Sequence, residues 1–178
     1  MKAVWLTKFN TPDSVCYTDV SNPTITENSV EIEVHGASVN PIDWKIRNGY
    51  LNPALPIVLG GDFSGIVVGV GASVTSFVPG DEVYGSAFML KNGSGSFAEY
   101  CVTDISNIAI KPKNADHLEA AALPLAGVSA LEALTETLHI SKGFKLLIHG
   151  GAGGIGHYAI QIAKNLGATV ATTINSTD

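Results

Sequence analysis

Residues 145–173 read KLLIHGGAGGIGHYAIQIAKNLGATVATT, and this stretch decides the fold. Its first part, residues 146–148, is a short continuous apolar run, which is typical of a strand buried on both faces. A glycine-rich segment then leads into apolar residues at helical spacing up to Leu166, and Gly167 stands where a helix commonly ends. Residues 169–173 are mostly β-branched and predict a second strand. The order is therefore strand, glycine loop, helix, strand.

The glycine-rich segment satisfies the pattern G-x-G-x-x-G and predicts a dinucleotide-binding unit of the Rossmann type. We expect Gly151 to allow a tight turn, Gly153 to let the backbone approach a pyrophosphate, and Gly156 to let the helix pack closely. The free N–H groups at the start of the helix favour binding of the negatively charged pyrophosphate. A glycine turn without a ligand is the alternative, but the flanking strands and helix favour binding. The predicted contacts are Gly151, Ala152, Gly153, Gly154, Ile155 and Gly156.

The end of the second predicted strand indicates which nicotinamide cofactor binds. Enzymes that use NAD carry an acidic residue there, about 20 positions past the loop, which holds the ribose 2′-hydroxyl. At this place the chain instead has Thr173, Asn175 and Ser176, and the first carboxylate after the second predicted strand is that of Asp178. Small hydroxyl and amide side chains leave room for a 2′-phosphate. We therefore expect NADPH rather than NADH, with Thr173, Asn175 and Ser176 among its contacts.

The sequence ends at Asp178, directly after the second predicted strand. A Rossmann sheet has about six parallel strands in two halves, and the nucleotide lies where the halves meet. Only one strand–helix–strand step is present, and its first strand keeps an unpaired edge. We therefore expect a truncated chain, either a fragment or a partial record of a longer protein, that is not a competent enzyme by itself.

Composition and charge exclude several classes of protein. Hydrophobic residues make up 46% of the 178 residues and charged residues 15%, which is typical of a globular protein that buries a core. The net charge of −6, without a basic stripe, argues against a nucleic-acid partner. Cys16 and Cys101 are too few for a disulfide framework, and no run approaches the ~20 apolar residues of a membrane span. Because the chain opens without a signal sequence, we expect a soluble, cytoplasmic protein.

Short strands separated by turns dominate residues 1 to about 115. In residues 30–34, valine and isoleucine alternate with glutamate, which predicts a half-exposed strand. Further strands are predicted at residues 66–70, 82–84 and 97–102, and residues 78–81 (VPGD) predict a turn. Strands of this length and spacing predict a small β-barrel or sandwich.

The chain becomes helical after residue 115. Asp116 followed by Glu119 fits a capping box, and the sequence that follows predicts a helix kinked at Pro124. We therefore expect two domains. Residues 1–124 form the barrel, and residues 125–178 form the first strand–helix–strand part of the nucleotide-binding domain.

Five motifs, in this order, resemble the medium-chain dehydrogenase/reductase superfamily and span nearly the whole chain. They are LGGDFSGIVVGVG (59–71), VPGDEVYG (78–85), GSFAEY (95–100), LPLAGVSALEAL (123–134) and the glycine loop. The resemblance implies an α/β protein in which a GroES-like, partly open β-barrel domain precedes a Rossmann domain. It also implies that substrate and nicotinamide meet in the cleft between the domains. In relatives the C-terminal strands of the Rossmann domain build a dimer, so the parent protein is expected to be a homodimer.

Zinc-dependent members of this superfamily carry a cysteine where this chain has Asn40, and a histidine where it has Gly61. The four clustered cysteines of their structural zinc site are missing as well. Without the thiolate and the imidazole, neither zinc site is expected to form, and we predict no metal ligands. Residues 40–49 (NPIDWKIRNG) instead resemble the zinc-independent quinone oxidoreductase family, which includes zeta-crystallin and the reductases of conjugated enones and alkenals.

The resemblance implies NADPH-dependent transfer of hydride to a quinone or to the C=C bond of an α,β-unsaturated carbonyl. Negative charge then grows on the carbonyl oxygen, and Asn40, Lys45 and Tyr50 are the candidate donors that stabilise it. A solvated surface lysine is the alternative for Lys45. Ser129 matches the segment that borders the nicotinamide in relatives. A non-catalytic, crystallin-like NADPH-binding protein is the alternative function.

Two further interpretations concern charged and aromatic side chains near these motifs. Asp43 and Arg47 are expected to form a structural pair rather than to act in catalysis. His149 and His157 flank the glycine loop without the spacing of metal ligands, and we interpret both as structural.

Overall fold

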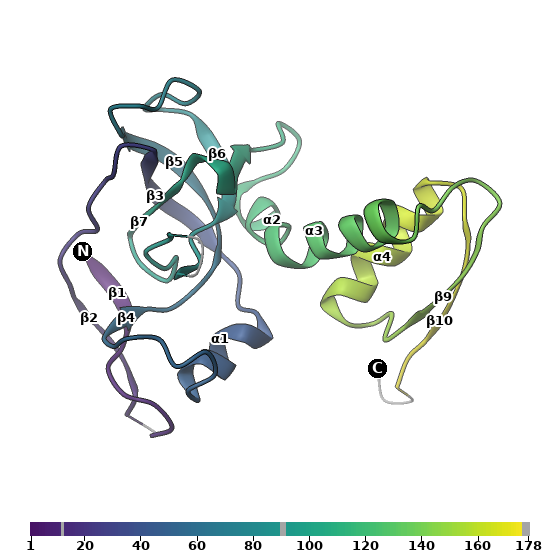
Figure 1. The fold of residues 1–178 in the computed structure, drawn as a ribbon, viewed down its shortest axis with the longest axis horizontal. Helices are drawn as coiled ribbons and strands as arrows, with labels where there is room; N and C mark the ends of the chain where they lie inside the picture. The colour runs from purple at the N-terminus through teal and green to yellow at the C-terminus, as the bar shows by residue number, and fades with distance from the viewer. Residues whose placement is uncertain (12, 90–91, 176–178) are drawn as a thin grey trace. The chain divides into compact units, whose positions relative to one another are not determined.

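The computed structural model describes residues 1–11, 13–89 and 92–175. The chain divides into two compact units, Met1–Pro124 and Leu125–Asp178. In Figure 1 the colour runs from purple at the N-terminus, through the first unit, to yellow at the end of the second. Each unit has its own hydrophobic core, so each is described by itself.

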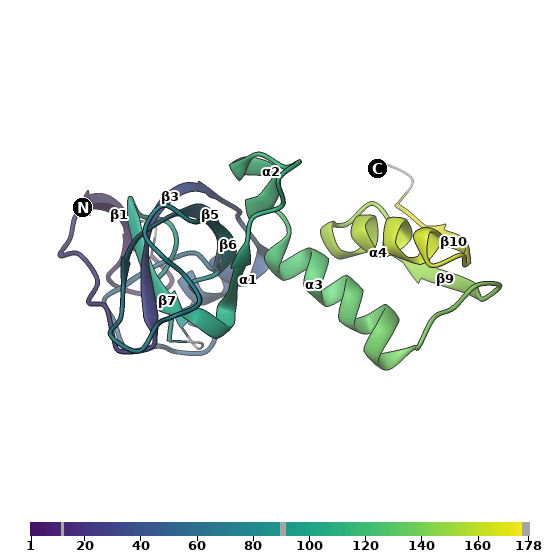
Figure 2. The ribbon, with the colours of Figure 1, turned by 90° about the horizontal axis from the view of Figure 1, so that it is seen from above.

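Strands dominate the first unit. Its elements are, in order, β1 (Lys2–Leu6), β2 (Val15–Asp19), β3 (Ser29–Ala37), α1 (Pro41–Arg47), β4 (Ile57–Val58), β5 (Asp62–Val70), β6 (Glu82–Ser86), β7 (Tyr100–Asp104), η2 (Ile105–Asn107), β8 (Ile108–Ile110) and α2 (His117–Ala121). One antiparallel sheet has the strand order β7-β3-β5-β6-β8, and a second has the order β2-β1-β4. β-bulges interrupt the pairing of β3 with β5, and the strands curve around a shared interior (Figures 1 and 2). The predicted partly open β-barrel is confirmed.

Alternating side chains on β3 build the interior of the larger sheet. Val30 and Ile32 are fully buried, whereas the side chains of Glu31 and Glu33 reach solvent. The half-exposed strand that the alternation predicts is therefore confirmed. The core also contains Phe63, Val67, Val83 and Cys101 from the neighbouring strands.

The strand predicted at residues 97–102 begins later than expected. β7 starts at Tyr100, and the residues before it contact the other sheet. The carbonyl oxygen of Phe97 accepts a bond of 2.8 Å from β1, and Ala98 forms a single bridge with the same strand. Glu99 contacts both sheets, because its N–H donates to the Lys2 carbonyl oxygen at 3.0 Å and its carbonyl oxygen accepts the Val34 N–H at 2.9 Å. These residues instead link the two sheets.

The capping box predicted before α2 is confirmed. The Asp116 N–H donates to Glu119 Oε2 at 3.0 Å, and the Glu119 N–H donates to Asp116 Oδ1 at 2.8 Å. The single kinked helix predicted through Pro124 is wrong, because α2 ends at Ala121 and a separate helix, α3 (Pro124–Glu132), begins at the proline. Proline has no N–H and a backbone φ that suits the first helical position, so it starts α3.

The second unit has the α/β arrangement that its sequence predicts. After α3 it contains η3 (Ala133–Thr137), β9 (Lys145–His149), α4 (Gly154–Asn165) and β10 (Thr169–Thr173). β9 and β10 are parallel neighbours with Thr173 opposite His149, and α4 connects them. Ala159 and Ala163 of α4 pack with Ile148 of β9 in the core of this unit. The predicted order of strand, loop, helix and strand is confirmed.

One face of β9 is left uncovered. Leu146 and Ile148 pack in the core with α4 and are half-buried, but Leu147 between them is 56% exposed. The burial on both faces predicted for residues 146–148 is therefore wrong within the described residues. The physical reason is that α4 covers a single face of a two-stranded sheet.

The helices of both units are short. Within the described ranges the longest is α4 with 12 residues, and no helix is long and apolar enough to cross a membrane.

The first residue of α2, His117, anchors this helix on the barrel. Its Nδ1 lies 2.8 Å from Ser64 Oγ, and the Ser64 hydroxyl donates its single hydrogen to the Val83 carbonyl oxygen at 2.9 Å. The hydrogen between His117 and Ser64 therefore sits on Nδ1. Since His117 Nε2 lies 3.5 Å from Glu82 Oε1, the group resembles a serine-histidine-acid triad. Ser64 is completely buried, however, so these residues hold α2 in place and offer no accessible nucleophile.

We expect His117 to make the stability of the first unit depend on pH. Burial lowers the pKa of His117 below its ordinary 6.5, and His35 lowers it further, against the opposing effect of Glu82. The folded protein therefore binds this proton less readily than the unfolded chain does. The contribution of the neutral His117 to the free energy of unfolding is present in full well above pH 6.5. It is lost as the pH falls from 6.5 towards the lower pKa of His117 in the folded protein. Urea unfolding at about pH 7.5 and about pH 5.5 should show a smaller loss for His117→Gln than for the wild type.

The same loss in both proteins would contradict this role of His117. The exposed His157 provides the matched control, because its replacement by Gln should leave the wild-type loss unchanged.

Candidate functional site

Helix α1 carries Lys45, one of the three residues that the sequence predicts as catalytic, while Asn40 precedes the helix and Tyr50 follows it. Ile42 and Ile46 pack with Leu6 and Leu59 in a small core, so one side of the helix is buried. The other side is exposed and bears Lys45. Lys45 is therefore exposed to solvent on a helix whose opposite side is held in place by packing.

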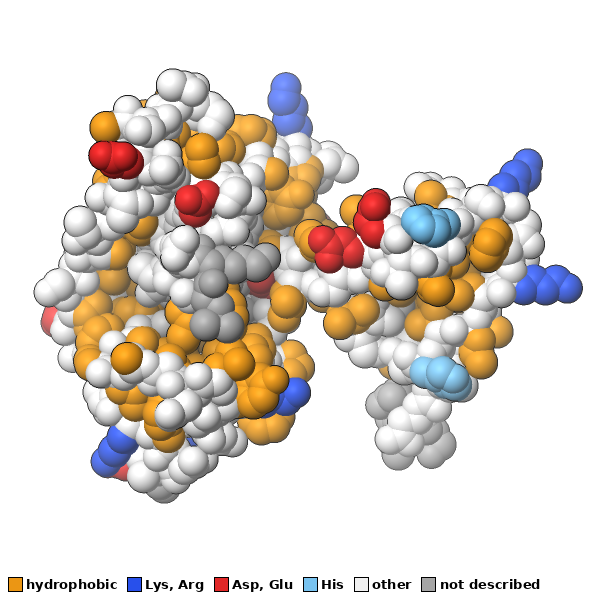
Figure 3. Space-filling model, viewed as in Figure 1, with side chains coloured by type: hydrophobic (Ala, Val, Ile, Leu, Met, Phe, Trp, Pro, Cys, Tyr) orange, Lys and Arg blue, Asp and Glu red, His pale blue; other side chains and the backbone are white. Residues whose placement is uncertain are grey.

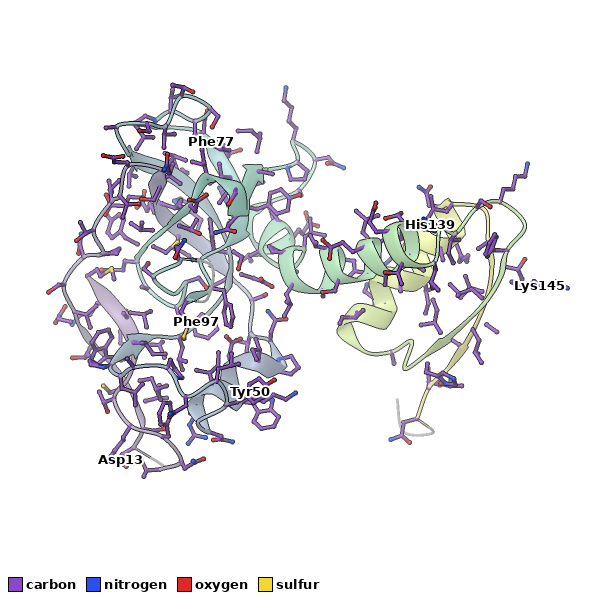
Figure 4. All side chains as sticks on the ribbon, in the orientation of Figure 1. Asp13, Tyr50, Phe77, Phe97, His139 and Lys145 are labelled. Carbon is purple, nitrogen blue, oxygen red and sulfur yellow. The ribbon has the colours of Figure 1, made fainter. Side chains whose placement is uncertain are left out.

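The end of α1 brings Lys45 and Tyr50 together. Gly49 has a φ of 85°, its N–H donates to the Ile46 carbonyl oxygen at 2.8 Å, and the Tyr50 N–H donates to the Lys45 carbonyl oxygen at 2.9 Å. These bonds form a Schellman motif, in which the residue after the glycine contacts the last turn of the helix. Figure 4 shows Tyr50 beside α1. Two of the predicted catalytic residues therefore share one surface.

An exposed apolar surface surrounds these two residues. Trp44 and Tyr50 are each 55% exposed, and Leu51 is 43% exposed. The Lys45 ammonium lies 5.9 Å from the centre of the Trp44 ring, within the range of a cation–π contact. We refer to Trp44, Lys45, Tyr50 and Leu51 as the α1 surface. Figure 3 shows hydrophobic and basic side chains next to one another over the part of the molecule where α1 lies.

The loop after α1 is strained where it completes the α1 surface. Leu51 and Asn52 have φ values of 68° and 38°, in the left-handed region that is costly for residues other than glycine. The Asn52 N–H donates to the Gly49 carbonyl oxygen at 3.1 Å and holds the turn. Backbone strain of this kind persists only where the surroundings impose it, and it clusters at functional sites. The strain therefore favours a functional role for this loop.

At the start of α1, the half-buried Asn40 belongs to a polar network around the buried Asp62. Its Nδ2 donates to Asp62 Oδ2 at 2.8 Å and to Ser38 Oγ at 3.2 Å. The Ser38 hydroxyl donates to the same Asp62 oxygen at 3.0 Å. An ionised carboxylate only accepts hydrogen bonds, so the amide nitrogen of Asn40 must face Asp62. Both amide hydrogens of Asn40 are then engaged, and its predicted role as a donor to substrate stays a prediction that this network opposes.

Asp43 and Arg47 do not form the pair expected from the sequence. The Asp43 carboxylate turns back and accepts the Asn40 N–H at 2.7 Å. Arg47 points to the loop after β1, where its Nε donates to Ser14 Oγ at 3.1 Å and its guanidinium donates to the Thr11 carbonyl oxygen at 3.2 Å. Each side chain thus fixes a different end of α1, which is why they do not meet.

Two buried carboxylates, Asp43 of α1 and Asp62 of β5, interact electrostatically. Asp43 is 4% exposed and Asp62 is 3% exposed. Burial raises the pKa of Asp43, the hydrogen bond from the Asn40 N–H opposes this, and the charge of Asp62 raises it again. A buried acid is stable only when its oxygens are hydrogen-bonded, so Asp62 depends on Ser38 and Asn40 as much as they depend on it.

We predict that Asp62→Asn destabilises the first unit by about 1–3 kcal/mol, because the donors of Ser38 and Asn40 lose a charged acceptor inside the protein. Chemical denaturation of the variant and the wild type measures the difference. Asp19→Asn is the matched control, since Asp19 forms an exposed ion pair with Lys2 that contributes little. Equal destabilisation by the two substitutions would contradict the polar network around Asp62.

The two positions where the sequence analysis predicts that zinc ligands are missing, Asn40 and Gly61, lie beside a different set of donors. Asn40 and Asp62 are hydrogen-bonded to each other there, and Gly61 offers no side chain. An added Cβ at Gly61 would lie 3.5 Å from the Phe88 ring, an ordinary contact distance, so packing alone does not exclude a side chain. In the described part of the chain no three His, Cys, Asp or Glu side chains gather as metal ligands. Independence from zinc remains a prediction.

In the second unit, close backbone contacts shape the glycine loop. An added Cβ would lie 2.1 Å from Thr172 Oγ1 at Gly151, and 2.2 Å from the Gly150 carbonyl oxygen at Gly156. Both glycines are therefore required by packing. The left-handed residue of the turn is Gly150, with a φ of 73°, rather than Gly151. At Gly153 the nearest atom would be 3.3 Å away, so this position leaves the loop open to an approaching ligand.

The start of α4 fits a pyrophosphate. The first intrahelical bond runs from the His157 N–H to the Gly153 carbonyl oxygen at 2.8 Å. The N–H groups of Gly154, Ile155 and Gly156 precede it, in the turn where N–H groups have no partner inside the helix. Ala152, Gly153, Gly154 and Ile155 are exposed. Exposed backbone donors at the positive end of a 12-residue helix suit a bound anion.

Of the remaining predicted cofactor contacts, Thr173 lies beside this loop. The Thr173 carbonyl oxygen accepts the N–H groups of Gly150 and Gly151, each at 3.0 Å. Ser129 lies half-buried on α3, the helix whose Ala126 comes within 4.0 Å of a Cβ added at Gly154. Asn175 follows β10 and is exposed. Ser176 lies outside the described residues.

Two residues that the sequence does not single out, Ser38 and Asp62, belong to these sites, together with His149, which the sequence analysis interprets as structural. Ser38 and Asp62 hold Asn40, and His149 is paired with Thr173. The register of two parallel strands places His149 opposite Thr173, and that signal is available from the sequence once both strands are predicted. No sequence signal joins Ser38 to Asp62, because they come together only when β3 pairs with β5.

Known proteins resemble this chain in sequence. Residues 26–113 match the family model of the alcohol dehydrogenase GroES-like domain. The chain is 40% identical over 186 residues to the 2-methylene-furan-3-one reductase of Solanum lycopersicum, covering 99% of the chain and 48% of the relative. It is 41% identical over 164 residues to a chloroplastic NADPH-dependent alkenal/one oxidoreductase of Arabidopsis thaliana, covering 88% and 42%.

The fold has close counterparts among solved structures. The quinone oxidoreductase from Coxiella burnetii superposes with a TM-score of 0.89 at 40% identity, covering 99% of this chain and 57% of that one. The chain thus spans about half the length of the curated relatives it matches.

Proposed function

We propose, from the match of residues 26–113 to the alcohol dehydrogenase GroES-like domain, that the protein is a nicotinamide-dependent oxidoreductase. Its acceptor is a quinone or the C=C bond of an α,β-unsaturated carbonyl, and it works without zinc. The observation that carries the proposal is 41% identity, over 88% of the chain, to an enzyme named for NADPH and alkenal/one substrates. The glycine loop before α4 supplies the matching cofactor site.

The residues of the second unit would hold the dinucleotide. Backbone N–H groups of Gly154, Ile155 and Gly156 face the pyrophosphate, and Gly153 permits its approach. The end of β10 offers Thr173 rather than a carboxylate, which supports NADPH over NADH. When bound, the reduced cofactor supplies hydride to the acceptor.

The α1 surface supplies the donors for the acceptor. As the β-carbon of an enone gains hydride, negative charge grows on its carbonyl oxygen and requires hydrogen-bond donors. Both hydrogens of the Asn40 amide are engaged by Asp62 and Ser38. The exposed Lys45 ammonium, with three donors, and the Tyr50 hydroxyl are therefore the donors that this segment offers. Trp44 and Leu51 beside them provide apolar contact for a planar acceptor.

We predict that Lys45→Met lowers kcat for enone reduction by roughly 10²-fold, because the variant keeps the aliphatic stem but loses the charged donor. Steady-state kinetics of the full-length protein that carries this chain measures the effect. Lys113→Met is the control, since Lys113 is also exposed and lies outside the α1 surface. A wild-type rate for folded Lys45→Met would return Lys45 to the role of a solvated surface residue.

The proposal itself is tested by oxidation of NADPH and NADH against a panel of quinones and enones, with and without a zinc chelator. We expect turnover that prefers NADPH and survives chelation. Activity that disappears on chelation together with stoichiometric bound zinc would overturn independence from zinc. No turnover of any acceptor by folded protein that binds NADPH would overturn the oxidoreductase function.

A further inference from the structure

His149 is held at the edge of the predicted cofactor site. It is the last residue of β9 and lies opposite Thr173, the last residue of β10. Its Nδ1 lies 3.1 Å from Thr173 Oγ1, and the Gly150 N–H donates to the same oxygen at 3.3 Å. Because the bond occupies Nδ1, the second ring nitrogen, Nε2, is the atom that can meet a ligand. The residue is exposed, so Nε2 is accessible.

Among the described residues at the carboxyl ends of β9 and β10, His149 has the only basic side chain. The described residues at the carboxyl ends of the two strands are His149, Gly150, Thr173, Ile174 and Asn175. Among them the imidazole alone can carry a positive charge. The end of β10 also lacks the acidic residue that holds a ribose 2′-hydroxyl in NAD enzymes. A phosphate on that hydroxyl would therefore meet no carboxylate and one potential cation.

We propose that His149, oriented by Thr173, recognises the 2′-phosphate of NADPH. The inference rests on the proposed nicotinamide-dependent function and names a residue that sets its cofactor preference. In a Rossmann unit the adenosine ribose lies at the end of the second strand, beside the glycine loop. The bond to Thr173 fixes the ring there, so that Nε2–H donates to a phosphate oxygen. Protonation of the ring turns this into a charge-assisted hydrogen bond.

A purely structural role for His149 makes a different prediction. If the imidazole only ties β9 to β10, then any side chain that reaches Thr173 should serve equally well. Asparagine can place a polar atom near the position of Nδ1, but it has nothing at the position of Nε2 and no charge. His149→Asn therefore separates the bond between the strands from contact with a ligand.

The experiment measures binding of adenosine 2′,5′-bisphosphate and of adenosine 5′-monophosphate to the full-length protein by calorimetry. We expect the wild type to prefer the bisphosphate, and His149→Asn and His149→Ala to weaken its binding by about tenfold, with the monophosphate nearly unchanged. Thr173→Val, which keeps the shape of Thr173 but cannot orient the imidazole, should give a smaller loss of the same kind. His157→Asn, on the exposed side of α4, is the matched control and should bind both probes as the wild type does.

Three outcomes would count against the inference in different ways. Wild-type preference in His149→Asn, with loss only in His149→Ala, would show a structural tie and overturn it. Equal binding of the two probes by the wild type would also overturn it, while leaving the proposed function intact. Binding of neither probe by folded wild-type protein would overturn the dinucleotide site itself, and with it the proposed function.

Discussion

The candidate catalytic segment depends on one buried carboxylate. Asp62 lies at the start of β5, almost without contact with solvent, and accepts hydrogen bonds from Ser38 and Asn40. A charge in that position is tolerable only if its oxygens stay bonded, so the loop between β3 and α1 is fixed by the need to satisfy it. A seven-residue helix follows, too short to be stable alone, and a Schellman motif closes its other end. The position of the α1 surface therefore depends on Asp62.

The second unit depends on a different constraint, the close approach of backbone segments. Gly151 and Gly156 leave no room for a side chain, and this brings the end of β9, the start of α4 and the end of β10 together. The exposed N–H groups of α4 and the paired side chains of His149 and Thr173 then lie along one edge of the loop. Packing that excludes side chains thus creates the site that the proposed cofactor would use.

Local patterns in the sequence predict much of this architecture. The alternation in β3, the capping box of Asp116 and the glycine loop are each set by residues a few positions apart, and the structure confirms them. The sequence fails where distant segments decide. Phe97 joins β1 rather than β7, Asp43 and Arg47 turn to different partners, and Leu147 lacks a second covering layer. The engagement of Asn40 by Asp62 likewise requires the pairing of β3 with β5, which no local pattern reveals.

The most direct test of hydride transfer is to follow an isotopic label from the cofactor into the product. NADPH carrying deuterium at both positions of C4 of the reduced ring, supplied with an enone to the full-length protein, should give a saturated ketone with one deuterium on the β-carbon and a solvent proton on the α-carbon. Mass spectrometry and proton NMR of the product locate the label. Deuterium on the β-carbon is the result that nicotinamide-dependent reduction requires. A reduced product without deuterium, or no product from protein that binds the cofactor, would contradict it.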